Sequence, residues 1–221
     1  MLRDILYSGS DEVGTGEYFG PIVVVALRFN NLEAYEYAKK IGVKDSKDLI
    51  NKDILRISEQ LRDKVEYSAK IFTPLDYHNI SNKFNLNHIK FKLHIEAHNS
   101  LNSGLKRVID KFTTKKSMLK YSKDLGLSFG LDDYILEEKA ENKYLEVAAA
   151  AIIAKRIWIN WMDDFLKKEG FNFDFNETFS VIQFHKELIA GNVKIKKTKE
   201  FMKPWPINKE LLKQEKKNMI R

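Results

Sequence analysis

The strongest constraint on the fold of this chain is a stretch near its beginning, residues 10–21, with the sequence SDEVGTGEYFGP. Two adjacent carboxylates, Asp11 and Glu12, close a short apolar segment, and three glycines and a proline follow them. An apolar run over residues 22–27 comes directly afterwards. This pattern predicts a strand that ends on acids, a tight turn, and a second strand paired back on the first.

Adjacent side chains of a regular strand point to opposite faces, which constrains how Asp11 and Glu12 are used. The two carboxylates share one site only if the strand is distorted or ends there, and Gly14 and Gly16 permit both. The alternative is that the acidic pair is simply the polar start of a surface turn. The stretch by itself leaves both interpretations open.

Composition limits the classes of protein to consider. The chain has 221 residues, and its 43% hydrophobic content supports a real core in one large domain or two small ones. The absence of cysteine excludes disulfides and thiolate metal sites. No apolar run approaches the roughly 18 residues of a membrane helix, and Arg3 and Asp4 interrupt any secretory signal. We therefore expect a cytoplasmic protein without a membrane partner.

Positive charge is concentrated at the carboxyl end. Residues 191–221 hold ten Lys or Arg and three Glu, an excess equal to the net charge of +7 of the whole chain. A basic tail on a neutral body favours a polyanionic partner, first of all nucleic acid. The alternative is a solvated, lysine-rich end that only aids solubility.

Strand and helix patterns alternate along the chain. Strands are predicted before residue 12 and over 21–29, 65–72, 105–112 and 134–137. Helices are predicted over 30–40, from the polar loop 43–48 to residue 61, over 88–102, and from Glu141 to Lys168 with Gly170 as the stop. The polar segment 113–133 is predicted to be an excursion over the surface. Such alternation indicates an α/β sheet domain.

Four acids stand at the ends of these elements: Asp11 and Glu12 on one strand, Asp110 on another, and Glu141 where the long helix is expected to begin. If the two strands are neighbours, the four side chains can converge at one edge of the sheet. Gathered carboxylates repel one another unless cations neutralise them, and all-oxygen ligation favours Mg²⁺ or Mn²⁺. Two such ions about 3.5–4 Å apart would support an in-line phosphodiester displacement.

Several of these motifs together resemble a known family. They are residues 10–21, the segment VKDSK at 43–47, residues 87–94, VIDKF at 108–112, and KAE at 139–141 leading into residues 147–156. In this order the chain resembles a prokaryotic type 2 ribonuclease H. Gly-Thr-Gly at 14–16 and Lys-Ala-Glu at 139–141 are similar to the type 3 branch of that family, ribonuclease HIII.

The resemblance implies a ribonuclease H-like fold, a five-stranded mixed sheet flanked by helices. Residues 1–170 would form the catalytic domain, and residues 171–221 a helical, basic extension packed on it or trailing from it. Members of this branch usually carry an amino-terminal platform that binds substrate, and this chain is expected to lack it. The basic tail would then partly replace the platform.

The activity implied by the resemblance is endonucleolytic hydrolysis of the RNA strand of RNA–DNA hybrids by a monomer, leaving 3′-hydroxyl and 5′-phosphate ends. Two ions of Mg²⁺ or Mn²⁺ would be held by the catalytic set Asp11, Glu12, Asp110 and Glu141. Backbone amides of Gly14, Thr15 and Gly16 would contact 2′-hydroxyls, and Lys44, Ser46 and Lys47 would hold phosphates. The alternatives are a hybrid-binding module without catalysis and an ATPase or kinase of the actin-like class.

Some aromatic and histidine side chains allow more than one role. His94 and His98, four residues apart on a predicted helix, superficially suggest zinc, but the glutamate placement of zinc proteases is missing and a packing or solvated face is favoured. Trp158 and Trp161 could stack on bases, although helical spacing favours the core. Phe201, Trp205 and Pro206, among lysines, fit a nucleic-acid surface and a packing role equally.

Overall fold

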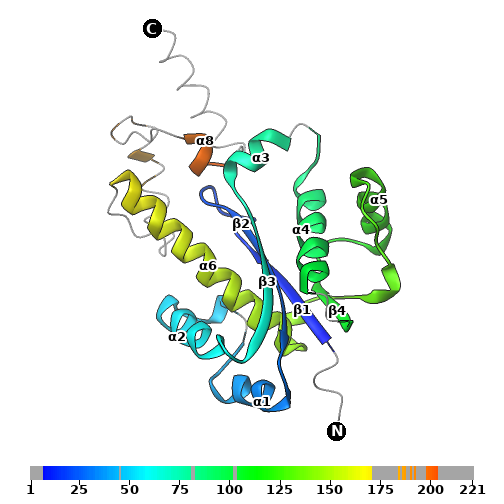
Figure 1. Ribbon diagram of the computed structural model, residues 1–221. Helices are drawn as coiled ribbons and strands as arrows, with labels where there is room; N and C mark the ends of the chain where they lie inside the picture. The colour runs from blue at the N-terminus through cyan, green and yellow to red at the C-terminus, as the bar shows by residue number, and fades with distance from the viewer. Residues whose placement is uncertain are drawn as a thin grey trace.

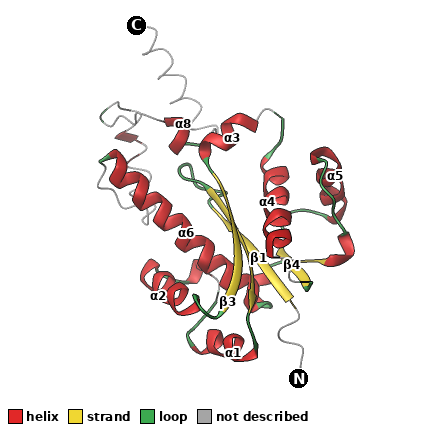
Figure 2. Ribbon diagram, in the orientation of Figure 1, coloured by secondary structure: helices red, strands yellow, loops and turns green. Residues whose placement is uncertain are grey.

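The computed structural model describes residues 7–44, 46–80, 83–101, 104–170 and 198–203, together with residues 184, 186, 187, 190 and 192. A sheet with helices on both faces forms its centre (Figures 1 and 2). Most of the expected extension 171–221 lies outside the described residues, so the division at residue 170 stays a prediction. Within the described ranges, the helices are too short or too polar to cross a bilayer.

The sheet has five strands in the order β3-β2-β1-β4-β5. Their bounds are β1 Tyr7–Val13, β2 Ile22–Phe29, β3 Val65–Phe72, β4 Lys106–Asp110 and β5 Tyr134–Glu137. β1–β2 and β2–β3 are antiparallel, whereas β1–β4 and β4–β5 are parallel. The expected five-stranded mixed sheet is confirmed, and the strand that carries the acidic pair lies at its centre.

The uninterrupted apolar run of β2 is explained by burial on both faces. Alternate residues beginning with Val23 pack under α6 (Leu145–Glu169), and those beginning with Ile22 pack under α4 (Leu86–Leu101). A strand covered on both sides has no solvated face and needs no polar residues. α1 (Leu32–Lys40) and α2 (Asn51–Leu61) accompany α6, and α5 (Lys115–Leu125) packs on α4.

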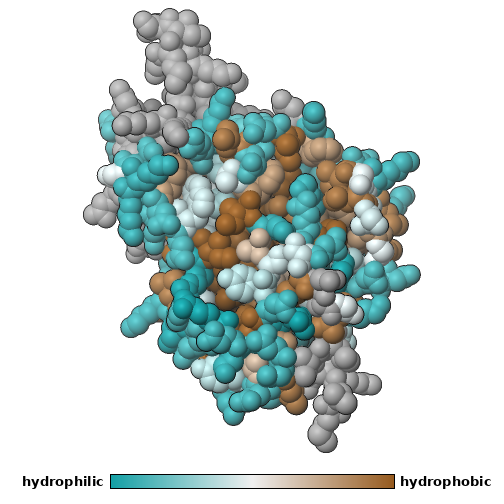
Figure 3. Space-filling model, viewed as in Figure 1, coloured by the Kyte–Doolittle hydropathy of each residue, from teal (hydrophilic) through white to brown (hydrophobic). Residues whose placement is uncertain are grey.

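The edge strand β3 is less covered than its neighbour. Ile71 and Tyr67 are both 46% exposed, and apolar surface gathers in the middle of the face on which β3 lies nearest the viewer (Figure 3). The remaining short helices are α3 (Pro74–Ile80), α8 (Thr198–Phe201), η2 (Ser46–Asp48), η3 (Leu131–Asp133) and η4 (Ala140–Asn142).

Gly9 sets the distance between α6 and the sheet. A Cβ atom at this position would lie 2.4 Å from the backbone nitrogen of Val147, closer than real Cβ atoms come to any neighbour. The buried alanines of α6, from Ala148 to Ala151, allow the same close approach from the other side. The helix therefore begins directly against β1, and the η4 turn that precedes it lies close to the strand ends.

Two sequence-based expectations are corrected. The long helix begins at Leu145, because Glu141 belongs to the separate turn η4, which follows a left-handed residue, Lys139. The segment 113–133 contains a helix, α5, where an excursion was expected. Thr114 caps α5 by accepting a hydrogen bond from the Ser117 amide, and Gly126 ends it at φ 64°. These caps are local signals that the polar composition obscured.

Candidate active site

A ladder of hydrogen bonds joins β1 to α4. Ser8, Ser10 and Glu12 alternate along one face of β1, and Lys90, His94 and His98 are spaced four apart along α4. His98 lies 3.2 Å from the Ser8 hydroxyl and 2.9 Å from the Ser10 hydroxyl, through Nδ1 and Nε2 respectively. His94 lies 2.8 Å from Ser10 through Nδ1 and 3.0 Å from Glu12 through Nε2. The ladder therefore ends on the Glu12 carboxylate.

Glu12 is held at each oxygen by a basic side chain of α4. Lys90 forms an ion pair with Oε1, and His94 contacts Oε2. Burial raises the pKa of Glu12, but the hydrogen bond and charge of His94, with those of Lys90, outweigh it and lower the pKa to about 2. Glu12 is therefore ionised and can only accept, which makes Nε2 of His94 the donor of the hydrogen bond between them.

Asp11 has the opposite electrostatics. Burial raises its pKa well above the usual value, and the charges of Glu12 and Asp110 add to this, while Lys47 opposes it. Its Oδ1 accepts a hydrogen bond of 2.8 Å from the Glu12 amide, which also lowers the pKa. Burial and the negative neighbours prevail. A half-buried carboxylate beside two others is a site where a cation would be stabilised.

Asp110 reaches this region from the parallel neighbour of β1. The last pair between β1 and β4 joins Ser10 to Ile109, so Asp11 and Asp110 each come one residue after it. Asp110 Oδ1 accepts a hydrogen bond of 3.0 Å from the Ala140 amide in η4. This bond fastens the turn that carries Glu141 to the end of β4.

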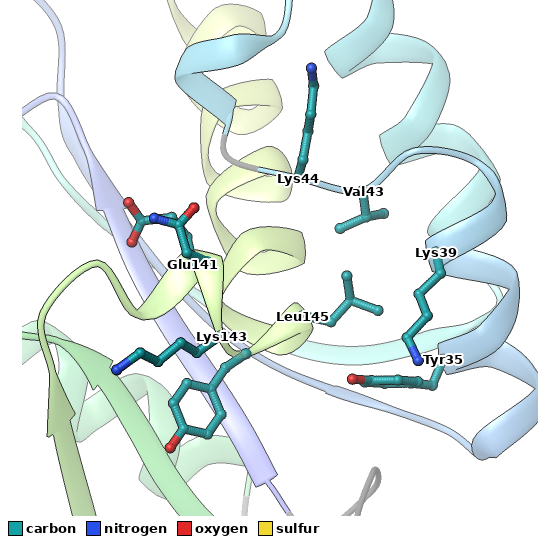
Figure 4. Close-up of a pocket in the computed structure, with 9 residues that line it drawn as sticks. Tyr35, Lys39, Val43, Lys44, Glu141, Lys143 and Leu145 are labelled. Carbon is teal, nitrogen blue, oxygen red and sulfur yellow. The ribbon is translucent and has the colours of Figure 1, made fainter.

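Glu141 lines a pocket of about 310 Å³ whose wall also includes Lys44, from the loop after α1 (Figure 4). The structure thus brings Asp11, Glu12 and Asp110 to adjoining strand ends and places Glu141 on the next turn. In the described part of the chain, however, no three His, Asp or Glu side chains are grouped closely enough to hold a metal ion. The donor chemistry fits a hard divalent cation, and side-chain movement would be needed to close a shell around it.

The Gly-Thr-Gly loop presents only part of itself to solvent. Gly14 is buried at φ 89°, and a Cβ there would lie 2.0 Å from the Pro21 carbonyl oxygen. Thr15 is half-buried and Gly16 is exposed, with open space where its Cβ would be. Gly14 is therefore needed for the turn itself, whereas Gly16 leaves room for the backbone of a ligand.

The predicted phosphate-binding residues lie at η2 and just before it. Lys44 and Lys47 are exposed and Ser46 is half-buried. Lys47 is close enough to the acids to lower the pKa of Asp11. The loop therefore adjoins the carboxylates, as a contact to the backbone of a bound strand requires.

The side chains from α4 are what sequence reasoning missed. His94 and His98 are buried and occupied by β1 hydroxyls and Glu12, so the packing role holds and a solvated face is wrong. The available signal was the coincidence of two spacings, polar residues every second position in β1 and every fourth in α4. Trp158 is buried in the core, and Phe201 is buried too, which makes a nucleic-acid surface at Phe201 wrong. Trp205 and Pro206 lie outside the described residues.

A mixed five-stranded sheet with acids where its central parallel strands end is the ribonuclease H-like arrangement. The chain belongs to the ribonuclease HII family, whose model matches residues 8–205. The match continues well beyond residues 147–156, the last of the motifs that carried the resemblance. Membership of this family sets aside the actin-like alternative.

Its relatives are of the type 3 branch, as the motifs predicted. A ribonuclease HIII of Streptococcus mutans is 38% identical over 177 residues, which is 77% of this chain and 58% of the relative. The chain thus spans less than three-fifths of that curated relative's length.

Two solved structures are similar to this chain in fold. Bst-RNase HIII in complex with Mn²⁺ has a TM-score of 0.81 at 25% identity, covering 97% of this chain and 71% of that one. The ribonuclease HII in a complex with PCNA from Archaeoglobus fulgidus, at 22% identity and a TM-score of 0.71 over 90% of this chain and 95% of that one, shares the fold.

Proposed function

We propose that this chain is an endonuclease that hydrolyses the RNA strand of RNA–DNA hybrids, leaving 3′-hydroxyl and 5′-phosphate ends. The observation that carries the proposal is the position of Asp11 and Asp110, side by side one residue beyond the last β1–β4 pair. Family membership supports the class of reaction. The relatives are much longer than this chain, so the activity of the whole relative is proposed here for the part that they share.

Asp11, Glu12, Asp110 and Glu141 would hold two ions of Mg²⁺ or Mn²⁺. Bound ions would supply an activated water and stabilise the oxygens of the displaced phosphodiester. The raised pKa of Asp11 supports this assignment, because a divalent cation relieves the repulsion that raises it. Glu12 is already ionised and oriented by α4, so it is ready to act as a ligand.

Substrate would be recognised by the neighbouring loops. Thr15 is half-buried and Gly16 is exposed, and their amides would contact 2′-hydroxyls, which distinguish RNA from DNA. The Gly16 amide donates a hydrogen bond of 3.1 Å to the Glu17 carboxylate, which substrate would replace. Gly14 would contribute by shaping the turn. Lys44, Ser46 and Lys47 would bind phosphates and fix the register of the strand. We expect the chain to act as a cytoplasmic monomer.

The test is cleavage of an end-labelled RNA–DNA hybrid in Mg²⁺ and in Mn²⁺, with the product ends mapped enzymatically. Asp11→Asn should lower kcat/KM by at least about 100-fold, because it removes a carboxylate ligand. Asp163→Asn, the same change at an exposed position of α6, is the matched control and should cleave normally. Full cleavage by Asp11→Asn would contradict the proposal, and binding without cleavage in either metal would favour the non-catalytic alternative.

A further inference from the structure

The loop after β1 is held by a segment that follows it by more than 180 residues in the chain. Three consecutive backbone carbonyls of the loop, those of Glu17, Tyr18 and Phe19, accept hydrogen bonds from Lys203. The side-chain Nζ donates to the first and third, at 2.9 and 2.8 Å, and the backbone amide donates to the second, at 3.1 Å. The next loop amide, Gly20, donates to the Phe201 carbonyl at 2.8 Å.

These contacts are in the interior of the molecule. Lys203 is only 1% exposed, and Phe19 stacks on Phe201 with ring centroids 5.0 Å apart. An ammonium so buried is stabilised by the carbonyls it reaches, since hydrogen bonds from a charged donor are stronger than neutral ones. From this position Lys203 cannot contact a nucleic acid, so any effect on substrate passes through the loop.

α6 supports the loop from another side. Trp158 Nε1 would lie 3.2 Å from a Cβ placed on either Gly14 or Gly20, so the indole fills the space beneath both ends of the turn. The loop is thereby fixed between α6 and residues 201–203. Its most exposed residue is Gly16, and Thr15, Glu17 and Tyr18 beside it are half-buried.

We propose that Lys203 is a positioning residue for recognition of the RNA strand. By binding three successive carbonyls, it fixes the loop in one conformation, from which the amides of Thr15 and Gly16 would reach the 2′-hydroxyls of a hybrid. The Gly16 amide would exchange its hydrogen bond to the Glu17 carboxylate for one to substrate. This inference rests on the proposed function for the identity of the ligand. The fixing of the loop by Lys203 does not depend on that function and can be measured without substrate.

The experiment compares Lys203→Met, which keeps the length of the side chain but not its donors, with Lys203→Arg, which restores donors. Amide hydrogen exchange by NMR, on the protein alone, reports the loop. Loss of the charged donor should speed exchange at Gly20 about tenfold or more and shift the resonances of Thr15 and Gly16. Lys203→Arg should return part of the protection.

Substrate recognition is measured separately, as affinity for an RNA–DNA hybrid and for a DNA duplex of the same sequence, in Ca²⁺. Lys203→Met should reduce the ratio of the two affinities about tenfold, since it disturbs the loop that reads the 2′-hydroxyl. Lys199→Met is the control: it removes an exposed lysine from the same segment, and should leave both the ratio and the loop exchange unchanged.

Unchanged exchange at Gly20 in a folded Lys203→Met protein would overturn the inference. So would faster exchange in the loop with an unaltered affinity ratio. If the unaltered protein shows no preference for the hybrid, the proposed function fails, while the exchange data still decide whether Lys203 holds the loop. If Lys203→Met does not fold, the test uses the unaltered protein. If Lys203 holds the loop, the amides of Gly20 and Lys203 must exchange with the same dependence on denaturant concentration. Different dependences would refute the proposal that Lys203 fixes the loop.

Discussion

Glu12 is held by two basic side chains of one helix, with Lys90 at one carboxylate oxygen and His94 at the other. In the protein without metal, α4 thus supplies the positive charge that a divalent ion would otherwise provide. Asp11, the adjacent residue, is buried among negative charges, and its pKa is raised. The two neighbouring acids therefore differ in their charge compensation. Glu12 is already neutralised by Lys90, whereas the Asp11 carboxylate would be stabilised by a bound metal cation.

Removing the Lys90 charge should destabilise the fold. Lys90→Met leaves the mostly buried Glu12 carboxylate with one partner fewer, and breaking such a pair costs on the order of 3 kcal/mol. Lys92→Met, two residues along the same helix, breaks a partly exposed pair with Glu96 and should cost about 1 kcal/mol or less. Urea denaturation of both variants provides the measurement, and equal losses would contradict the role given to Lys90.

Lys203 should make the stability depend on pH. Burial lowers its pKa to about 7, although the Glu17 carboxylate acts in the opposite direction. Because an unfolded lysine titrates near about 10.4, the unfolded chain binds more protons than the folded one between these values, and stability rises with pH there. The free energy of unfolding, relative to Lys203→Met, should increase from about pH 7 to pH 10 and stay level below. Parallel curves for the two proteins across that range would show that burial does not lower the pKa of Lys203.

The acids of the site could be predicted from the sequence because each belongs to a local motif: Asp11 and Glu12 before a glycine turn, Asp110 at a strand end. Their convergence follows from the parallel pairing of β1 with β4, which from the sequence alone was only a condition. Lys90 and His94 carry no such local signal. Their roles depend on which face of α4 meets β1, and that is set by packing of the whole sheet.

At the scale of elements, the ladder between β1 and α4 is possible because two repeats match. Two residues of a strand advance about 6.6 Å, and four residues of a helix advance about 6 Å. Ser8, Ser10 and Glu12 therefore stay opposite His98, His94 and Lys90 at three successive positions. A helix that lies along a strand in this way can orient a row of hydrogen-bonded polar side chains, with no loop residue taking part.

Most of the regular elements were predicted from periodicity, and the differences have local causes. β2 and β3 differ from their predicted bounds by one residue or not at all, since their apolar patterns have sharp edges. α5 was missed because only Met118 and Tyr121 of the helix are buried, too few to produce a clear apolar stripe. The beginning of α6 was misplaced because the apolar segment does not distinguish a preceding turn from the first turn of a helix.

The close contact between Gly9 and α6 should be intolerant of a methyl group. Gly9→Ala places a Cβ 2.4 Å from the Val147 nitrogen, and should destabilise the fold by about 1–3 kcal/mol as α6 is displaced. Gly16→Ala has nothing within 4 Å of the added atom and should leave the melting temperature unchanged, yet lower the affinity for a hybrid. Calorimetry and binding assays on the two variants make the comparison. A Gly9→Ala protein as stable as Gly16→Ala would show that α6 can shift without cost.

At the scale of the whole molecule, the basic end of the chain has two parts. Phe201 and Lys203 are buried, so residues 198–203 belong to the body that contains the site. Beyond Lys203, residues 204–221 hold five Lys or Arg and two Glu. Removing all of residues 191–221 would therefore disturb the core together with the charge, and a test of the charge has to begin after Lys203.

A chain that ends at Lys203 should bind a hybrid more weakly and with a flatter dependence on salt. Each phosphate that the shortened chain no longer neutralises reduces the slope of log affinity against log salt by about 0.9. The matched control keeps the length of the tail but changes its five basic residues to Gln, and should behave as the truncated chain does. Anisotropy titrations over a range of salt measure both. An unchanged slope would mean that the tail serves only solubility.

The bond from Lys203 to the carbonyl of Glu17 spans 186 positions of sequence, and this has a consequence for synthesis. A ribosome adding about 5–20 residues per second needs on the order of ten seconds or more to travel between the two. The strands that carry the acids can pair long before then. The loop after β1, however, gains its hydrogen bonds to residues 201–203 only after those residues have left the ribosome. A nascent chain thus completes its sheet early and its recognition surface late.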